Sequence, residues 1–544
     1  MAPGNERDDA SPKGLSRRHF ITVGSAGVGA TLLSACVSNP IVMSDNGQAQ
    51  DEQKIITDRE TRSFNPIPEE NAKPGTTDWE LEGRVDGRIQ GFAGNISVKQ
   101  GEKVTLYVTA PAGTAWKGEV YRIGWYRGAG GRLVTTIADK SGVGQKHFKY
   151  MKGGNDNLIE CPWKPSVDVK TDKSWTTGVY LVKLITNDGS MSYIPFIVRD
   201  DRPSTYFNQT SVTTWLAYNT YGGRSIYGDI KTDHYKKAFT GRSRLTSFDR
   251  PFSMEERFLL NGAERFLEFE IQMVRFMESR GYDVTYGTNL ETHRNPELIA
   301  QHDTFLSVGH DEYWTKEMRD NLELIRDSGV NLCFLGANAG YRAVRLEDSP
   351  IGPLRRMRHY KEYTEDPLLG KDDPRVAAQW RYGPTDRPEN ALIGIMYAAD
   401  PVDFPWVAAA TDHWLYRKTG FTKGESVPHL VGHEYDKAWT EGAFAKTTPQ
   451  NLQIVARSPV RTEQGGKDVA HSAYHTAPSG AGVFATGTIR WTWGLDGYGT
   501  GSNVTTHYHN PGIVSPKIQK MTENLLHVFS QGPAGNYLEI KGLA

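Results

Sequence analysis

The sequence predicts a multidomain α+β protein, in which an antiparallel β-sandwich precedes a doubly wound α/β domain that carries an insertion. Three observations support this prediction. The chain has 544 residues, more than one compact domain usually holds. Short alternating apolar runs fill the stretch before residue 200, and strand and helix patterns alternate after it.

These changes of pattern divide the chain into six parts. They are a targeting segment (1–36), a disordered linker (37–78), an Ig-like β-sandwich (79–200), an α/β domain (201–350), an insertion (351–478), and the closing strand and helix of the α/β domain (479–544).

The first part consists of export signals and is not expected to belong to a folded domain. Arg17 and Arg18 form a twin-arginine signature, and 22–33 is a short Gly- and Ala-rich apolar stretch. Leu33 to Cys36 resembles a bacterial lipobox, in which the cysteine is lipidated. We expect export by the twin-arginine route to a periplasmic or other extracytoplasmic location, with a membrane anchor at Cys36. A plain exported protein cut elsewhere, or an uncut anchor, is the alternative.

The sandwich is predicted from its strands. Runs at 96–98, 104–108, 119–123, 178–184 and 194–198 are short, rich in β-branched and aromatic residues, and separated by Gly- and Asp-containing turns. About seven antiparallel strands in two layers are typical of such a pattern.

The α/β domain is predicted from alternating elements. An amphipathic helix over 259–280 precedes a strand at 282–286, and 304–308 forms a buried strand. A helix capped by Thr315 then leads to a strand at 331–338. Right-handed crossovers between such strands build a doubly wound sheet.

The loop after the strand at 304–308 collects reactive side chains. It holds His310, Asp311 and Glu312, followed by a phenol and an indole. In open α/β sheets, ligands bind beyond the carboxyl ends of the strands. We therefore expect His310 and Glu312 to be functional, although helix capping and an ion pair of Glu312 with Arg342 would also explain them.

A second functional loop is expected near the C-terminus. A strand at 483–486 precedes a tryptophan-rich loop, and a helix over 516–529 closes the chain. If that strand belongs to the same sheet, Arg490, Trp491 and Trp493 would line one pocket with His310. Within the insertion, the neighbouring His433 and Glu434 are more typical of a surface turn than of a metal site.

Composition excludes some functions. The 63 basic and 64 acidic residues give a net charge of -1, which argues against a nucleic-acid partner. The three cysteines match neither a disulfide framework nor a zinc motif. Cys333 lies in an apolar strand and is predicted to be an inert buried thiol.

Five stretches together resemble the family built around the large (beta) subunit of N,N-dimethylformamidase. They are Trp215 to Tyr227, Ser247 to Pro251, Ser307 to Trp314, Leu335 to Asn338, and Gly487 to Asp496. The resemblance covers roughly residues 80 to 530, in the order expected of that family.

The resemblance implies a domain similar to class I glutamine amidotransferases without their nucleophilic cysteine. It also implies a mononuclear iron held by two tyrosines and a glutamate beside a histidine. The histidine and glutamate match His310 and Glu312, and Tyr218 is the best match for one tyrosine. For the second, the sequence offers Tyr227 and Tyr235.

The expected function is an exported amidase-like hydrolase of small C–N (amide) substrates. His310 would act as general base or proton shuttle near the iron, with Arg490 as a further catalytic residue. The sequence leaves open a small partner subunit or a homo-oligomer.

Two other functions fit the residues. A carbohydrate-active hydrolase would pair Glu312 and Asp311 with Asp249 or Asp496, and use the loop tryptophans as sugar platforms. A non-catalytic lipoprotein would bind a cell-surface ligand through the sandwich and the aromatic loops.

Overall fold

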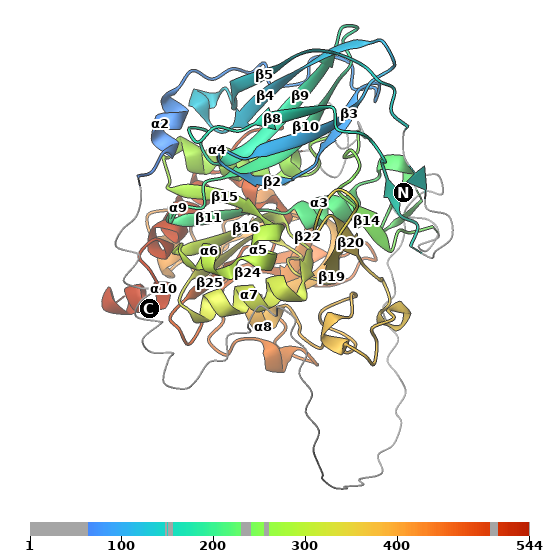
Figure 1. Ribbon diagram of the computed structural model, residues 1–544. Helices are drawn as coiled ribbons and strands as arrows, with labels where there is room; N and C mark the ends of the chain where they lie inside the picture. The colour runs from blue at the N-terminus through green and yellow to red at the C-terminus, as the bar shows by residue number, and fades with distance from the viewer. Residues whose placement is uncertain are drawn as a thin grey trace, which may run out of the picture.

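The computed structural model describes residues 64–146, 149–150, 156–229, 241–254, 261–500 and 510–542. The protein is a mixed α/β structure with several sheets (Figure 1). Cys36 and the rest of the predicted targeting segment lie outside the described residues, as does Tyr235. Within the described ranges, no helix combines the length and hydropathy needed to cross a membrane.

Two sheets form the N-terminal part, at the top of Figure 1. The smaller contains β1 (Gln90–Ala93), β3 (Lys103–Thr109) and β8 (Val167–Lys170), in the order β1-β3-β8. The larger has the order β2-β10-β9-β4-β5, with β2 (Ser97–Lys99), β10 (Met191–Arg199), β9 (Gly178–Thr186), β4 (Ala115–Ile123) and β5 (Gly131–Ser141).

These two sheets share one apolar core. Val104 and Leu106 of β3 lie in the same buried cluster as Val120 of β4 and Val182 of β9. All five runs predicted as strands are found here. One pairing differs from the prediction of antiparallel strands, because β10 runs parallel to β2.

The central sheet has seven strands in the order β15-β11-β16-β18-β25-β24-β23. The parallel strands are β11 (Tyr206–Thr210), β15 (Val284–Thr288), β16 (Thr304–His310), β18 (Asn331–Ala337) and β25 (Gly482–Ala485). Numbered along the chain, they have the order 2-1-3-4-5 of doubly wound sheets. The chain reverses its direction of winding between β11 and β16.

Helices cover both faces of this sheet. On one face lie α5 (Asn289–Arg294), α6 (Pro296–Ala300) and α7 (Lys316–Asp327), and Phe305 packs with Met318 in their core. On the other lie α3 (Val212–Tyr218), α4 (Ile271–Ser279) and α9 (Pro516–Phe529), and Leu306 packs with Trp215. Adjacent residues of a strand face opposite sides, so Phe305 and Leu306 enter different cores.

Most predicted elements are present. Within the predicted disordered linker (37–78), however, the structure has a short helix, α2 (Ile67–Ala72), with Ile67 and Glu70 buried. The amphipathic helix expected from residue 259 begins as a π-helix, η6 (Phe266–Glu270), and becomes α-helical only as α4. As predicted, Thr315 caps α7, where its hydroxyl accepts a hydrogen bond from the Met318 amide at 3.1 Å.

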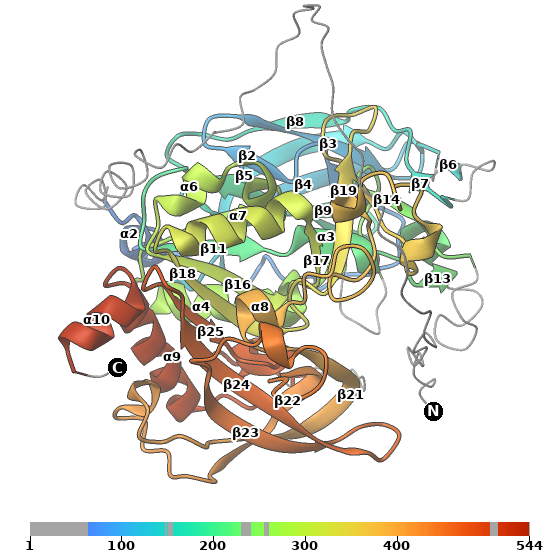
Figure 2. The same ribbon diagram turned by 90° about the horizontal axis from the view of Figure 1, so that it is seen from below.

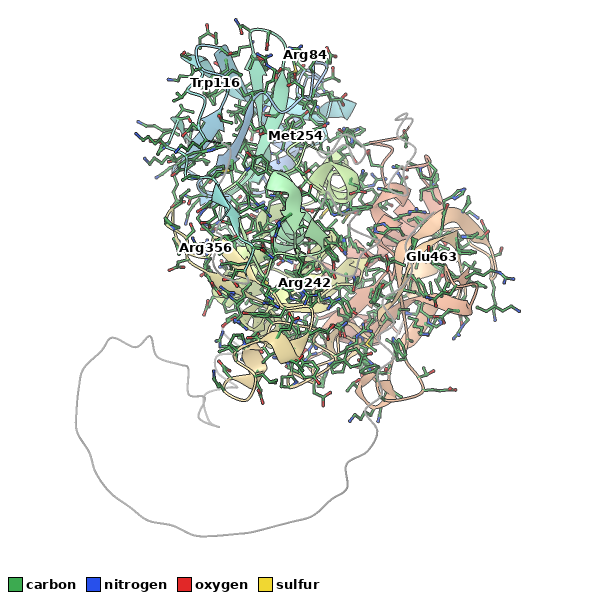
Figure 3. All side chains as sticks on the ribbon, turned by 90° about the vertical axis from the view of Figure 1, so that its right-hand side faces the viewer. Arg84, Trp116, Arg242, Met254, Arg356 and Glu463 are labelled. Carbon is green, nitrogen blue, oxygen red and sulfur yellow. The ribbon has the colours of Figure 1, made fainter. Side chains whose placement is uncertain are left out.

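The region predicted as an insertion is partly built into the sheets. Antiparallel β24 (Lys467–Thr476) and β23 (Gln453–Arg461) extend the central sheet, so the excursion from it ends well before residue 478. Figure 2 shows this hairpin beside β21 (Met396–Val407) and β22 (Ser426–Lys437). In Figure 3, Glu463 in its turn lies far from Trp116 of the N-terminal sheets.

A small mixed sheet lies beside the central one, in the order β14-β20-β19-β17. Its strands are β14 (Leu245–Ser247), β20 (Arg356–Arg358), β19 (Arg342–Glu347) and β17 (Tyr313–Thr315). Because β17 follows β16 almost directly, this sheet continues the chain from the end of a central strand.

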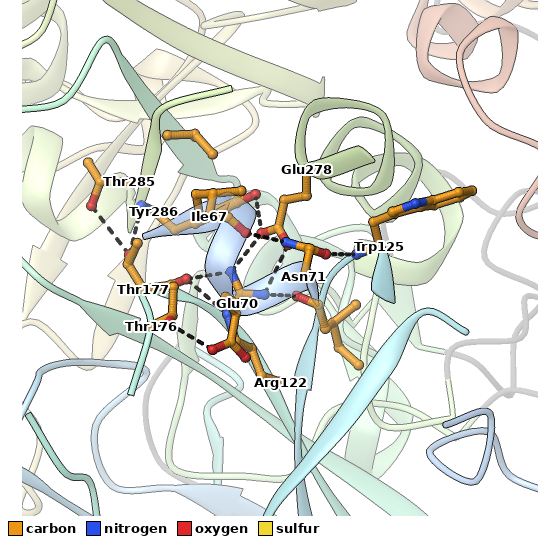
Figure 4. A network of polar contacts seen from close by, with 12 residues as sticks. Ile67, Glu70, Asn71, Arg122, Trp125, Thr176, Thr177, Glu278, Thr285 and Tyr286 are labelled. Atoms are coloured by element: carbon orange, nitrogen blue, oxygen red, sulfur yellow. Dashed lines mark hydrogen bonds and ion pairs between the residues drawn. The ribbon is translucent and has the colours of Figure 1, made fainter. Parts of the chain in front are cut away.

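A buried polar network joins the N-terminal sheets to α4 (Figure 4). Arg122 of β4 donates to both carboxylate oxygens of Glu278, at 2.7 and 2.9 Å, and both side chains are fully buried. Asn71 and Tyr286 also donate to Glu278, at 2.8 and 2.9 Å. Bidentate pairing and these extra hydrogen bonds compensate the desolvation of the ion pair.

Candidate functional site

The candidate site lies where β11 and β16 end side by side. Tyr218 is the last residue of α3, which follows β11, and His310 is the last residue of β16. A doubly wound sheet opens a crevice at such a switch point, because neighbouring strands lead to helices on opposite faces. The sequence-predicted loop therefore occupies the expected position.

Buried hydrogen bonds hold the loop after β16 in place. The carboxylate of Asp311 accepts from Gln209 at 2.6 Å, from Ser307 at 2.8 Å and from Asn289 at 3.0 Å. The amide of Glu312 donates to the Thr214 hydroxyl of α3 at 2.9 Å. Asp311 thus has a structural role, and its hydrogen bonds fix the positions of His310 and Glu312 on either side of it.

Two phenols and a carboxylate meet at this point. The hydroxyl of Tyr218 donates to Oε2 of Glu312 at 2.8 Å, and that of Tyr227 donates to the Tyr218 hydroxyl at 2.8 Å. The Tyr227 hydroxyl also lies 3.3 and 3.4 Å from the Glu312 oxygens. Tyr313 also contacts Tyr227, with 2.5 Å between the two hydroxyl oxygens.

Tyr227 comes from a short hairpin. It lies in the turn between β12 (Arg224–Ser225) and β13 (Gly228–Asp229). The sequence left the second tyrosine open between Tyr227 and Tyr235, since neither sits in a convincing motif. The structure brings Tyr227 to Tyr218 and Glu312.

His310 stands between two carboxyl groups. Its Nε2 is 3.3 Å from Oε2 of Glu312 and 3.6 Å from Oε1 of Glu434. Among the described residues, its Nδ1 has no hydrogen-bond partner. His433, beside Glu434 in β22, has its Nε2 3.7 Å from the same Glu434 oxygen.

Burial and neighbouring charges shift the pKa values of Glu312 and Glu434 in opposite directions. Burial raises the pKa of Glu312, but His310, Lys361 and Arg342 outweigh it and hold that pKa well below its ordinary value. Burial, together with the charges of Asp400 and Glu312, raises the pKa of Glu434 well above its ordinary value. Glu312 is therefore the anionic group of the pair, and Glu434 is the protonated one.

Burial also controls the other titratable groups. It lowers the pKa of His310 despite the nearby Glu312, which favours the neutral imidazole. Burial, with the adjacent Glu312 charge, raises the pKa values of Tyr218 and Tyr227 well above normal. With only protein groups around them, both phenols keep their protons.

The prediction that His433 and Glu434 lie in a surface turn is wrong. Both side chains are buried within β22, at a point where the Gly432–His433 peptide bond is cis and the register against β21 shifts. The flanking Leu430, Val431 and Tyr435 are apolar and buried, which is the sequence signal that indicates burial. The sequence contained no signal that this strand would cross beside β16.

The C-terminal loop is placed next to the site rather than in it. Arg490 donates to Asp403 at 2.8 Å and to the His429 carbonyl at 3.1 Å, and its guanidinium lies over the Trp493 ring. Trp491 is fully buried, and Trp493 nearly so. Trp493 stacks on Phe269, whose ring in turn contacts His433.

The carboxylates invoked for carbohydrate chemistry have other partners. Asp249 forms a buried ion pair with Arg355 at 2.5 Å, and Asp496 pairs with Arg275 at 2.7 Å. Buried tryptophans present no open face to a sugar. Asp249 and Asp496 therefore do not join Glu312 in a glycosidase-like pair, and Trp491 and Trp493 do not form a stacking platform.

The two described cysteines are buried, and neither is suited to act as a nucleophile. Burial raises the pKa of Cys161 to about 12 and that of Cys333 well above normal. Cys333 lies within β18, as the sequence predicts. Neither thiol occupies the turns that follow β16 and β18.

The fold and the site define a mixed α/β protein with a buried Tyr–Tyr–Glu–His cluster at the switch point of its parallel sheet. In the described residues, no group of three His, Cys, Asp or Glu side chains could hold a metal ion. The cluster described above is of another kind, because two of its oxygen atoms belong to tyrosines. The chain belongs to the N,N-dimethylformamidase beta subunit-like family, whose C-terminal model matches residues 117–509. No curated protein matches the sequence.

Proposed function

We propose that the protein is an amidase-like hydrolase of small C–N substrates, with an iron ion held by Tyr218, Tyr227 and Glu312. The observation that carries this proposal is the convergence of three oxygen donors beside His310. Membership of a family named for an amide hydrolase supports the reaction class.

The residues present fit an iron centre. Two phenols and one carboxylate are hard oxygen donors, which suit ferric iron. Their oxygens already lie 2.8 to 3.4 Å from one another, and they come from three separate chain segments. A ferric ion bound there would supply a Lewis acid that polarises the amide carbonyl.

The proton transfers belong to His310 and Glu434. His310 accepts a proton from the attacking water as the new C–O bond forms. Glu434 donates a proton to the leaving nitrogen as the C–N bond breaks. The proton on His310 then returns to Glu434, whose Oε1 lies 3.6 Å from Nε2, so the products are a carboxylic acid and an amine.

The fold of the α/β domain and of the N-terminal sheets agrees with this chemistry. The strand order 2-1-3-4-5 fits an amidotransferase-like domain, and the two-layered N-terminal sheets fit an Ig-like β-sandwich. Asn338, in a left-handed conformation at φ 58, occupies the turn after β18. With no thiol at this turn, water rather than a cysteine attacks the substrate.

The site of action is outside the cytoplasm. The twin-arginine signature and the lipobox-like sequence ending at Cys36 support export and a lipid anchor. The twin-arginine route carries folded proteins, which is compatible with an iron acquired before export. A small partner subunit or self-association is part of this proposal.

The test combines metal analysis with hydrolysis. We expect purified protein to contain iron and to hydrolyse N,N-dimethylformamide or a related small amide, and we expect Glu312→Ala and Glu312→Gln to lose both properties. Glu441→Gln, an exposed change of the same kind, is the control. Metal-free wild-type protein after iron reconstitution, or unchanged hydrolysis by the Glu312 variants, would rule out this mechanism.

A further inference from the structure

Each of the two phenol rings has a cation over its face. The Arg265 guanidinium carbon lies 4.4 Å from the centroid of the Tyr218 ring. The Lys361 ammonium nitrogen lies 3.8 Å from the centroid of the Tyr227 ring. Both cationic side chains are largely removed from solvent, with Arg265 8% and Lys361 7% exposed.

The two cations come from unrelated parts of the chain. Arg265 directly precedes the π-helix η6, and its Nη1 donates to Glu268 in that helix at 2.8 Å. Lys361 follows β20 in the small mixed sheet. A π-helical turn often marks a functional position in a helix, and here it holds the cation that faces Tyr218.

Burying two cations beside two aromatic rings requires compensation. A desolvated cation is attracted to the electron-rich face of a ring, and this attraction favours one plane of the ring. It increases when the phenol loses its proton to become a phenolate, as a phenol would do on binding a ferric ion. Lys361 and Arg265 also lie close enough to influence Glu312 and Glu434 electrostatically.

From this arrangement we infer that Arg265 and Lys361 are positioning residues for the metal site. Arg265 fixes the ring of Tyr218, and Lys361 fixes the ring of Tyr227, so that both hydroxyls point to Glu312. Their charges offset the negative charge of the three-oxygen donor set. This inference rests on the proposed iron site and assigns its affinity to residues that do not bind the metal.

The experiment measures iron binding rather than turnover. Lys361→Met and Arg265→Met remove the charge at similar length, while Lys361→Arg and Arg265→Lys keep it. Lys541→Met is the matched control, because Lys541 lies 5.7 Å from the Tyr537 ring in the C-terminal helix region. Apo-protein is titrated with iron against a competing chelator, and the visible phenolate-to-iron absorption is recorded.

We expect each Met variant to weaken iron binding by about tenfold or more and to shift the absorption band. The charge-keeping variants and Lys541→Met should bind as the wild type does. Thermal melting of each apo-protein identifies variants that fail to fold, and the charge-keeping variants then decide the question.

Three outcomes overturn different statements. If the wild type binds iron and both Met variants bind it equally well with an unchanged band, the positioning role is wrong and the iron site stands. If Lys361→Arg and Arg265→Lys lose iron as fully as the Met variants, cationic charge is not the cause. If the wild type itself binds no iron, the proposed function fails, and the positioning role fails with it.

Discussion

Oε1 of Glu434 lies 3.6 Å from Nε2 of His310, although the two residues belong to different layers of the molecule. His310 ends a strand of the central parallel sheet, and Glu434 lies in β22 of the added β21–β22 pair. The region that was expected to be a peripheral insertion therefore completes the candidate site. The reaction should require both.

Replacing Glu434 by Gln should abolish most of the activity. The amide keeps the size of the side chain but cannot donate and take back the proton, and such catalysis is worth about a hundredfold or more. Iron content should stay at the wild-type level, because Glu434 is not among the proposed ligands. Steady-state amide hydrolysis and metal analysis on the same samples check this.

Glu441→Gln serves as control for the charge change, since Glu441 is exposed. If Glu434→Gln retained more than about a tenth of the activity, the assigned proton donor would be wrong, because a general acid contributes far more than that. Loss of iron in this variant would instead place Glu434 among the ligands.

Tyr227→Phe and Tyr235→Phe should separate the two candidates for the second phenol ligand. Removing the Tyr227 hydroxyl eliminates a donor that lies 2.8 Å from Tyr218, so iron affinity should fall by at least about 100-fold. Tyr235→Phe should leave it unchanged. Chelator competition measures both, and the opposite ranking would transfer the ligand role to Tyr235.

Arg490→Lys tests the sequence prediction that Arg490 is catalytic. In the structure its guanidinium pairs with Asp403 and packs on Trp493. We therefore expect a loss of stability of roughly 1–2 kcal/mol and only a small change in kcat, because Arg and Lys differ in stacking and bidentate pairing. Arg417→Lys, on the surface, is the control. A large fall in kcat without destabilisation would restore the catalytic role.

Patterns of neighbouring residues in the sequence predicted most of the strands, helices and helix caps. The apolar run before His310 and the capping threonine before α7 each depend on neighbours in sequence, and both are confirmed. The position of His310 at a strand end was likewise predictable, because the parallel sheet follows from alternating strands and helices. The catalytic role of Arg490 stays a prediction, and its pairing with Asp403 depends on contacts between distant segments that no local pattern indicates.

The rest of the site depends on contacts between distant segments. Tyr227 lies in a two-strand hairpin too short to have a periodic signal, and its place is determined by Tyr313 and Lys361. Glu434 is buried in a strand whose partner is β21, and no pattern within β22 indicates that it passes His310. Composition and periodicity describe a segment, whereas these positions are properties of the assembled layers.

The pH dependence of stability should depend on buried Glu270. Burial raises its pKa to about 8, although its Oε1 accepts a hydrogen bond from Trp215 at 2.7 Å. The folded protein keeps this proton between the ordinary glutamate pKa of 4.5 and about 8, while the unfolded chain releases it. Raising pH through this window therefore destabilises the folded state.

Glu270→Gln should remove this contribution. We expect the variant to match the wild type near pH 5 and to exceed it by on the order of 1–3 kcal/mol near pH 8.5. Denaturant unfolding at several pH values measures the difference, with exposed Glu297→Gln as control. A stability difference that is constant with pH would show that Glu270 titrates normally in the folded protein.

The Arg122–Glu278 pair should be essential for the junction between the N-terminal sheets and α4. Arg122→Met leaves the Glu278 carboxylate fully buried without its bidentate partner, which costs about 3–5 kcal/mol. The double variant Arg122→Met/Glu278→Gln removes both charges and should recover a substantial part of this loss. Unfolding midpoints of the three proteins measure the coupling. For comparison, Lys103→Met breaks an exposed pair with Asp168 and should cost far less, because solvent screens that pair. If Arg122→Met were no more destabilising than Lys103→Met, the two parts would be held together by their apolar contacts alone, and the buried ion pair would have no role in positioning α4 and the π-helix that precedes it.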